Sequence, residues 1–321
     1  MYKLRKWIDV NKIDWGSAGS LPNSIDFLEK NYDKIVFSAL LTNPSAIHII
    51  SKNVNKINQW YFLSCNPSAV PFLEKNKDKI YWPLLSYNRN AIYLLEKNLD
   101  KLDNIDWHAL SENPNAIPIL SKNMDKIFWD RLSKNPNAID ILSKNMDKIH
   151  WNYLSENPNA IDILSKNIDK IDWKCLSRNP NAIHLLEKNN DKINWCELSQ
   201  NPNAINILSK NIDKIDWYML SENPNAIDIL SKNIDKISWY MLSKNPNAIH
   251  LLEKNYDKIF WSGLSQNPSI FDYDYEALEC RCNIYKEELI KKSMHPSVIT
   301  RYLNHPELKD KDLEYILDNC F

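Results

Sequence analysis

Metal binding and nucleophilic catalysis require histidine, cysteine or carboxylate side chains grouped at characteristic spacings. The chain contains no His-Glu-x-x-His motif and no Cys-x-x-Cys pair. Its histidines are scattered, at His48, His108, His150, His184, His250, His295 and His305. Its cysteines are equally irregular, at Cys65, Cys175, Cys196, Cys280, Cys282 and Cys320. The closest two, Cys280 and Cys282, would point in different directions on a helix. We therefore predict no metal site, no cofactor and free thiols in a reducing compartment.

The other residue types used in catalysis recur along the chain instead of occurring once. Asp169 and Ser177 have counterparts about every 22 residues. Carboxylates at such regular spacing suit pairing with a neighbouring lysine better than they suit acid–base catalysis. Only three glycines are present, which excludes a glycine-rich phosphate loop. Because an enzyme needs its site only once, we predict a protein without catalytic residues.

The elements that would position any site are copies of one 22-residue unit. The clearest copy is NPNAIDILSKNIDKIDWKCLSR, which begins at Asn157. Regular copies begin at Asn113, Asn135, Asn179, Asn201, Asn223 and Asn245, and looser ones at Leu21, Asn43, Asn66 and Asn88. A half-unit, Asn11 to Trp15, precedes the array, and Asn267 to Ile270 ends it. The chain therefore has about eleven repeats.

Each unit has the signals of a longer helix followed by a shorter one. Asn157 and Pro158 are typical of a helix N-cap and its first position, and apolar residues follow at helical spacing. Asn167 is predicted to end the first helix in a left-handed conformation. Asp172 would cap the second helix, which carries Trp173. Period-two alternation is absent, so we expect no strands.

The predicted fold class is all-α: an α-solenoid in which each unit buries its apolar face against its neighbours. Helices packed roughly 8–10 Å apart would give an arc on the order of 100 Å long. We expect three parts: an N-terminal cap at residues 1–20, the repeats at 21–270, and a C-terminal helical cap at 271–321. The last part has predicted helices at about 275–293, 297–303 and 313–317. An alternative role for it is a separate docking module.

Tryptophan and lysine form two ladders along the array. The tryptophans favour a role in the core, and the alternative is a stacking platform for bases or sugars. Lysines recur at Lys144, Lys166, Lys188, Lys210 and Lys232, which leaves nucleic-acid binding open as a less favoured alternative. Aspartates at Asp147, Asp169, Asp191, Asp213 and Asp235 accompany them, and such lattices usually solvate a surface.

Positions that vary between otherwise constant repeats are candidates for partner binding. Two positions in the shorter helix, directly after the tryptophan, change from copy to copy. In a two-layer arc these positions should line the concave side, although neutral drift at exposed positions would give the same pattern. The candidate residues are Asp130, Arg131, Tyr153, Lys174, Glu197, Tyr218, Met219, Tyr240 and Met241. The Tyr and Met residues among them are typical of adaptable binding surfaces.

Charge and hydropathy limit the classes of partner. Forty Lys and Arg residues oppose forty-one Asp and Glu residues, giving a net charge of −1. This balance disfavours duplex DNA or an anionic membrane as the dominant partner. The sequence contains neither an apolar run long enough to span a membrane nor a signal peptide, so we expect a cytoplasmic protein.

The combination of NPNAI, the DKI turn and the recurring Trp resembles tandem repeats in proteins of giant nucleocytoplasmic DNA viruses of the mimivirus kind. The resemblance covers about residues 21–270. It implies a viral protein acting in the host cytoplasm or virus factory, and it supplies no catalytic residues. We expect a non-enzymatic scaffold that binds a protein partner through its concave surface. The alternatives are a nucleic-acid-binding helical array and a self-associating structural component of a viral particle or fibre.

Overall fold

The computed structural model describes residues 1–98 and 105–303. Two compact units are present, one formed by Leu4–Phe271 and the other by Met1–Lys3 with the chain from Asp272 onward. The predicted helix at about 313–317 and Cys320 lie outside the described residues. The all-α repeat fold is confirmed, because short helices recur along the Leu4–Phe271 unit and successive inner helices contact one another over most of it.

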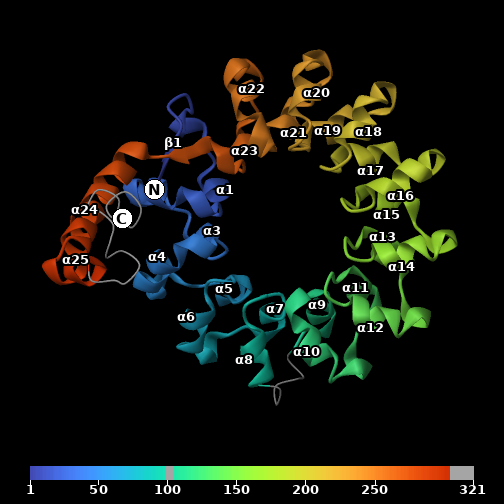
Figure 1. Ribbon diagram of the computed structural model, residues 1–321, viewed down its shortest axis with the longest axis horizontal. Coiled ribbons are helices and arrows are strands. Elements are labelled where there is room, and N and C mark those ends of the chain that lie inside the picture. The colour runs from blue at the N-terminus through green and yellow to red at the C-terminus, as the bar shows by residue number, and fades with distance from the viewer. Residues whose placement is uncertain (99–104, 304–321) are drawn as a thin grey trace. The chain divides into compact units, whose positions relative to one another are not determined.

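The helices that begin at the Trp position form the inner layer of this unit, and the helices that follow the Asn-Pro turn form its outer layer (Figure 1). Twelve inner helices are described: α1(Trp15–Gly19), α3(Phe37–Leu40), α5(Trp60–Cys65), α7(Trp82–Leu85), α9(Trp107–Glu112), α11(Trp129–Lys134), α13(Trp151–Glu156), α15(Trp173–Arg178), α17(Trp195–Gln200), α19(Trp217–Glu222), α21(Trp239–Lys244) and α23(Trp261–Leu264). Eleven outer helices are described: α2(Ile25–Lys30), α4(Ile47–Lys52), α6(Val70–Glu74), α8(Ile92–Glu96), α10(Ile117–Leu120), α12(Ile139–Ser143), α14(Ile161–Ser165), α16(Ile183–Lys188), α18(Ile205–Ser209), α20(Ile227–Ser231) and α22(Ile249–Lys254).

Short 3₁₀ helices connect the two layers. Those at the Asp-Lys turn are η1(Val10–Lys12), η3(Tyr32–Lys34), η5(Val54–Lys56), η6(Lys77–Lys79), η9(Met124–Lys126), η10(Met146–Lys148), η11(Ile168–Lys170), η12(Asn190–Lys192), η13(Ile212–Lys214), η14(Ile234–Lys236) and η16(Tyr256–Lys258). Those at the Asn-Pro turn are η2(Pro22–Ser24), η4(Pro44–Ala46), η8(Pro114–Ala116), η15(Pro246–Ala248) and η17(Pro268–Ile270). The other described units have an irregular turn there.

The expected longer helix is divided, because the Asn-Pro segment folds as a turn before the α-helix begins. Asn157 is extended (φ −72°, ψ 116°), and its side-chain oxygen accepts a hydrogen bond from Asn159 N at 3.0 Å. The α-helix starts only at Ile161. The predicted left-handed end at Asn167 is wrong: its φ is −133°, and its amide donates to Ile163 O at 2.8 Å instead. No described residue has a positive φ.

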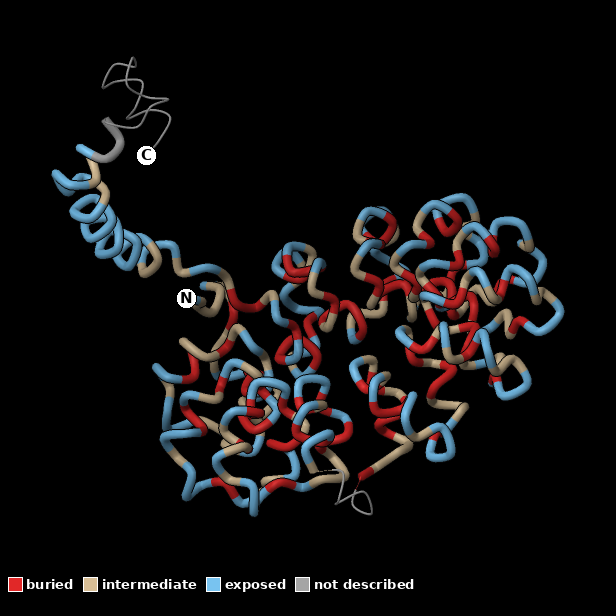
Figure 2. Tube along the Cα trace, turned by 60° about the horizontal axis from the view of Figure 1, so that its bottom comes forward, coloured by how far each residue is buried: buried red, intermediate tan, exposed pale blue. Residues whose placement is uncertain are grey.

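The buried core is a continuous strip of Leu, Ala and Ile between the two layers (Figure 2). Leu176 of one unit and Ala182 and Leu186 of the next are fully buried. Trp173 is half-buried, with Lys192 Nζ of the next turn 4.7 Å from the centre of its indole ring. The same Lys–Trp stacking recurs between neighbouring units, as at Lys170 over Trp151. The indoles therefore pack against the core on one side and are covered by an alkylammonium chain on the other.

Buried asparagine and serine side chains tie each unit to the previous one. The Asn179 amide donates to Ser155 O (3.0 Å) and to Asn157 O (2.9 Å). Ser177 Oγ donates to Trp173 O and accepts from Asn194 N at 3.0 Å. These links repeat along the array. Since the Asn and Ser side chains at these positions are almost fully buried, each hydrogen bond replaces one that water would otherwise make.

The array closes on itself into a ring within the Leu4–Phe271 unit (Figure 1). Adjacent inner helices are in close contact, whereas the outer helices spread apart. The expectation of an arc with two capped ends is therefore wrong for this unit. Residues from Leu4 onward belong to the ring instead of forming a separate N-terminal cap.

The half-unit at the start of the chain completes the unit that Asn267 begins. Asp14 N donates to Ser265 Oγ at 2.9 Å, as Asn194 N does to Ser177 Oγ. Asn23 Nδ2 donates to Pro268 O at 2.6 Å, and Lys12 Nζ lies 5.0 Å from the centre of the Trp261 ring. Each contact is the counterpart of one made between internal units. We call this set of contacts the joint.

A small sheet follows the last Asn-Pro turn, where an outer helix follows in the other units. It consists of β1(Tyr2–Leu4) and β2(Phe271–Tyr273). Arg5 N donates to Ile270 O and Asp274 N donates to Met1 O, which is an antiparallel register. The expectation of no strands is wrong here, because three-residue strands are too short to produce a recognisable alternation.

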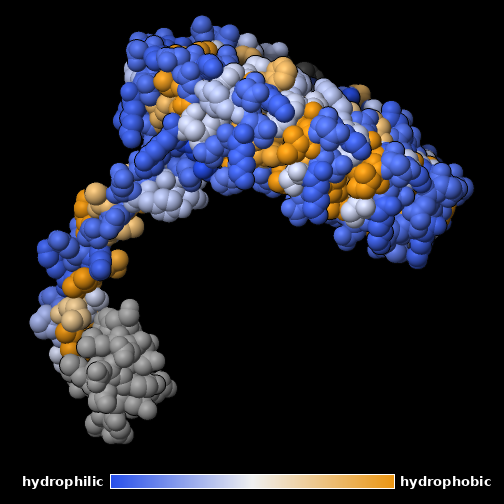
Figure 3. Space-filling model, turned by 90° about the horizontal axis from the view of Figure 1, so that it is seen from above, coloured by the Kyte–Doolittle hydropathy of each residue, from blue (hydrophilic) through white to orange (hydrophobic). Residues whose placement is uncertain are grey.

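In the second unit, α24(Tyr275–Ser293) and α25(Pro296–Leu303) agree with the two predicted helices that fall on described residues. Asp274 accepts a hydrogen bond from Ala277 N at the start of α24, and Lys3 Nζ pairs with Asp274 at 3.2 Å. Side chains along α24 are mostly exposed, and hydrophobic ones alternate with hydrophilic ones on its surface (Figure 3).

Replacing Asn179 by Ala should destabilise the protein much more than replacing Asn181 by Ala. The first change removes two amide donors from buried carbonyls, which costs about 2–4 kcal/mol. Asn181 donates one exposed hydrogen bond, to Pro158 O, so its loss should cost below about 1 kcal/mol. Urea unfolding followed by circular dichroism measures both. Equal losses of unfolding free energy would show that the buried asparagine hydrogen bonds do not hold the units together.

Candidate functional site

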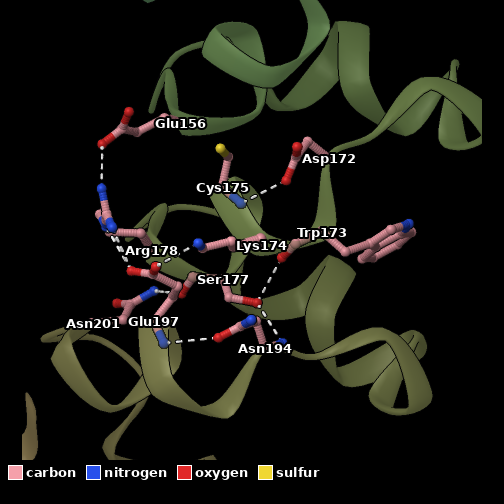
Figure 4. Close-up of polar contacts among 10 residues, drawn as sticks. All are labelled: Glu156, Asp172, Trp173, Lys174, Cys175, Ser177, Arg178, Asn194, Glu197 and Asn201. Atoms are coloured by element: carbon pink, nitrogen blue, oxygen red, sulfur yellow. Dashed lines mark hydrogen bonds and ion pairs between the residues drawn. The ribbon is translucent and has the colours of Figure 1, made fainter.

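The inner helices present one side to the ring interior. The third and fourth residues after each Trp, such as Leu176 and Ser177, are buried against the outer layer. The opposite side of each inner helix carries the residue before the Trp and the first, second and fifth residues after it. We call these positions the inner face. In Figure 4, Trp173 points away from Glu156, Arg178 and Glu197, which gather on that other side.

The candidate residues all belong to the inner face, but they differ in accessibility. Tyr218 is 50% exposed, Tyr240 is 39% exposed, and Lys174 is also exposed. Half-buried members are Asp130, Arg131, Tyr153 and Met219. Glu197 and Met241 are only 8% and 7% exposed, so their expected outward position is wrong.

Close approach of neighbouring inner helices explains this burial. Glu197 and Met241 occupy the second position after Trp, where another unit has Gly263. A Cβ atom added at Gly263 would lie 3.2 Å from both Ser243 Cβ and Tyr240 O of the previous helix. The adjacent unit therefore covers Glu197 and Met241, whereas Arg131, Tyr153 and Met219 at the same position stay half-buried. A single repeat does not reveal this difference.

Exposed aromatic rings gather over α19, α21 and the start of α23. Tyr240 and Phe260 meet edge to face, with ring centres 5.7 Å apart at 89°, and Phe260 is 50% exposed. Lys244 Nζ lies 4.5 Å from the Tyr240 ring centre. We call Tyr218, Tyr240 and Phe260 the aromatic arc.

Sequence reasoning missed Phe260, although a signal was present. The residue before Trp is a helix cap in several units; Asp172, for example, accepts from Cys175 N at 2.9 Å. Phe260 has no side-chain acceptor and cannot serve this purpose. A second group of exposed aromatic residues was missed because it lies in the looser repeats, at Tyr61, Phe62, Tyr81 and Tyr87.

A charged cluster connects α13, α15 and α17 (Figure 4). Arg178 donates to Glu197, with Nε 3.0 Å from Oε2, and it also contacts Glu156 at 3.3 Å. Lys174 Nζ lies 3.8 Å from Glu197 Oε1. The hydrogen bond to Glu197 raises the pKa of Arg178. The cluster therefore stays charged, and it connects three successive units through partly buried ion pairs.

A second cluster surrounds Arg131 on α11. Its Nε donates to His108 at 2.7 Å, and its guanidinium lies 3.4 Å from Glu112 and 3.7 Å from Asp130. The Tyr153 ring centre lies 6.0 Å from the same guanidinium. Both arginines of the inner helices α11 and α15 are thus engaged by carboxylates, which weakens their attraction for phosphate.

The thiol of Cys175 is poorly suited to nucleophilic chemistry. Desolvation, followed by the nearby Asp172 carboxylate, raises the pKa of Cys175 to about 11. The thiolate is the reactive form, so little of it exists at neutral pH. Among residues 1–98 and 105–303, no three His, Cys, Asp or Glu side chains are grouped to hold a metal ion.

Comparison with known proteins identified no relative: the chain matches no protein-family model, no curated protein sequence and no solved structure. The inner face must therefore be interpreted from its own geometry. Within the described part of the chain, no helix is long and apolar enough to cross a membrane.

Cys175 should react with iodoacetamide much more slowly than the exposed Cys280 at pH 9. Because folding raises the Cys175 pKa above the ordinary value of 9.0, its neutral form stabilises the fold below pH 9. This contribution is lost as the pH rises toward about 11. Peptide mass spectrometry of alkylated protein gives the rate at each thiol. Equal rates for Cys175 and Cys280 would contradict the assigned environment.

Proposed function

We propose that this protein is a non-enzymatic scaffold whose ring binds a segment of a protein partner against its inner face. The aromatic arc carries this proposal. Tyr218, Tyr240 and Phe260 are 39–50% exposed, while neighbouring Leu residues are fully buried. Aromatic side chains gathered in this way are typical of binding hot spots.

The charged clusters support a protein as the partner in preference to nucleic acid. Arg131 and Arg178 are already paired with carboxylates. The lysines of several Asp-Lys turns lie over indole rings, as Lys192 lies over Trp173. The other recurring lysines lie at the ends of outer helices, as Lys166 does at the end of α14, and not on the inner face. A nucleic-acid array needs cations free to neutralise successive phosphates. The resemblance of the repeat unit to giant-virus proteins supports, as part of this proposal, a viral protein acting in the host cytoplasm or virus factory.

The test is peptide-display selection against the wild-type protein, followed by calorimetric measurement of the affinity of the enriched peptides. The variant Y218S/Y240S/F260S should bind them at least about tenfold more weakly, since each lost aromatic anchor costs about 1 kcal/mol or more. The matched control is Y93S/M124S/I234S, whose sites lie away from the inner helices and are 37–40% exposed.

The control variant should keep wild-type affinity, and both variants should keep the helical circular-dichroism signal. Selected peptides that bind the aromatic-arc variant as tightly as the wild type would remove the basis of the proposal. A steep loss of affinity for single-stranded oligonucleotides with salt, with no peptide enriched, would favour the nucleic-acid alternative.

A further inference from the structure

The joint differs from every other interface in the ring because its two sides are not consecutive in the chain. One side is the N-terminal segment, which includes Lys12, Asp14 and Asn23, and the other includes Trp261, Ser265 and Pro268. Each of these contacts has a counterpart at the internal interfaces, such as Asn194 N to Ser177 Oγ and Lys192 over Trp173. Because every copy carries the same two sides, the N-terminal segment of one chain can make these contacts with the last unit of another chain.

We propose that the joint exchanges between copies, so that a second copy of this chain is a specific partner. Two opened rings pair, and each N-terminal half-unit completes the last unit of the other chain. This assembly contains two joints, the same number as two closed monomers. It goes beyond the proposed binding function and uses none of the aromatic-arc residues.

Side-chain hydrogen bonding at the joint is poorer than within the array. The repeat that begins at Leu21 has leucine where the other repeats begin with asparagine. Inside the array, the Asn245 amide donates to Ser221 O (3.1 Å) and Asn223 O (2.9 Å). Leu21 has no amide with which to make the equivalent hydrogen bonds. Three buried side-chain atoms of described residues lack a hydrogen-bond partner, and two of them, Trp7 Nε1 and Asn23 Oδ1, belong to the N-terminal segment. Each such group costs free energy.

Other contacts hold the joint closed, and all of them can re-form between copies. Arg5 Nε donates to Ser269 O at 2.8 Å, and the Phe27 and Phe271 ring centres lie 5.5 Å apart. Since monomer and dimer make the same contacts, their balance depends on the effective concentration of the chain's own N-terminal segment. Refolding at high protein concentration raises the concentration of competing N-terminal segments and therefore favours exchange.

Mixed cysteine variants distinguish the two states. The rings of Tyr2 and Tyr273 stack at 4.9 Å across the two strands, so cysteines at these two positions are close enough for a disulfide. Chains carrying Tyr2→Cys with an affinity tag are mixed with untagged chains carrying Tyr273→Cys, with Cys280, Cys282 and Cys320 replaced by Ser in both. The mixture is unfolded in urea, refolded and oxidised.

The expected result is a disulfide-linked pair of one tagged and one untagged chain, increasing several-fold with protein concentration during refolding. A chain carrying both cysteines should instead form an internal disulfide when refolded dilute. Unlinked monomers at every concentration, or failure of the double variant to close, would overturn the proposal.

The rate of exchange without denaturant provides a second test. Lys12→Ala removes the cation–π contact to Trp261 at the joint, and Lys148→Ala removes the equivalent contact to Trp129 inside the array. Lys12→Ala should make the mixed disulfide form about two- to fivefold faster, because opening the joint becomes easier. Lys148→Ala should leave the rate unchanged. Equal rates for the two variants would show that exchange does not proceed through the joint.

Discussion

The buried asparagine amide that begins each unit is the interaction on which the ring depends. Helices of five or six residues are unstable alone and leave carbonyl groups without partners at their ends. The Asn179 amide satisfies one such carbonyl, Ser155 O at the end of α13. It also donates to Asn157 O, and its own oxygen accepts from Asn181 N in the next turn. Because the side chain is short and fully buried, it fixes adjacent inner helices at close distance. The apolar core then stabilises an arrangement that these hydrogen bonds have already defined.

Ring closure follows from the same constraint. Inner helices that lie close together and outer helices that spread apart bend the array in one direction until it completes a turn (Figure 1). After this turn the last unit meets the first. The chain divides the closing unit between its two ends, so Asp14 and Lys12 complete what Asn267 begins. A ring made in this way has no exposed end of its core.

The sequence was sufficient to predict the repeats, the all-α fold and the contribution of the tryptophans to packing, because each rests on a pattern within one unit. Features that involve two units were not predicted. The burial of Glu197 and Met241 depends on how closely the next helix approaches, and the role of Asn157 depends on carbonyls 22 and 24 residues earlier. Closure could have been suspected from the two partial units, since Asn11–Trp15 supplies the turn and tryptophan that the segment after Asn267 lacks.

Different positions of each unit serve stability and surface variation, and this explains why the inner face can differ from unit to unit and so determine binding specificity. The recurring Asn and Ser side chains form the buried hydrogen bonds between units, and the recurring Leu and Ala side chains form the core. Changing them would destabilise the ring. Variable side chains on the concave side converge, so that Tyr240 and Phe260 of neighbouring units touch at 5.7 Å. On the outer layer the helices diverge (Figure 1), so exposed side chains of neighbouring outer helices lie farther apart. Convergence allows one partner segment to contact several units at once, and each unit can then contribute a different side chain without disturbing the hydrogen bonds that hold it in place.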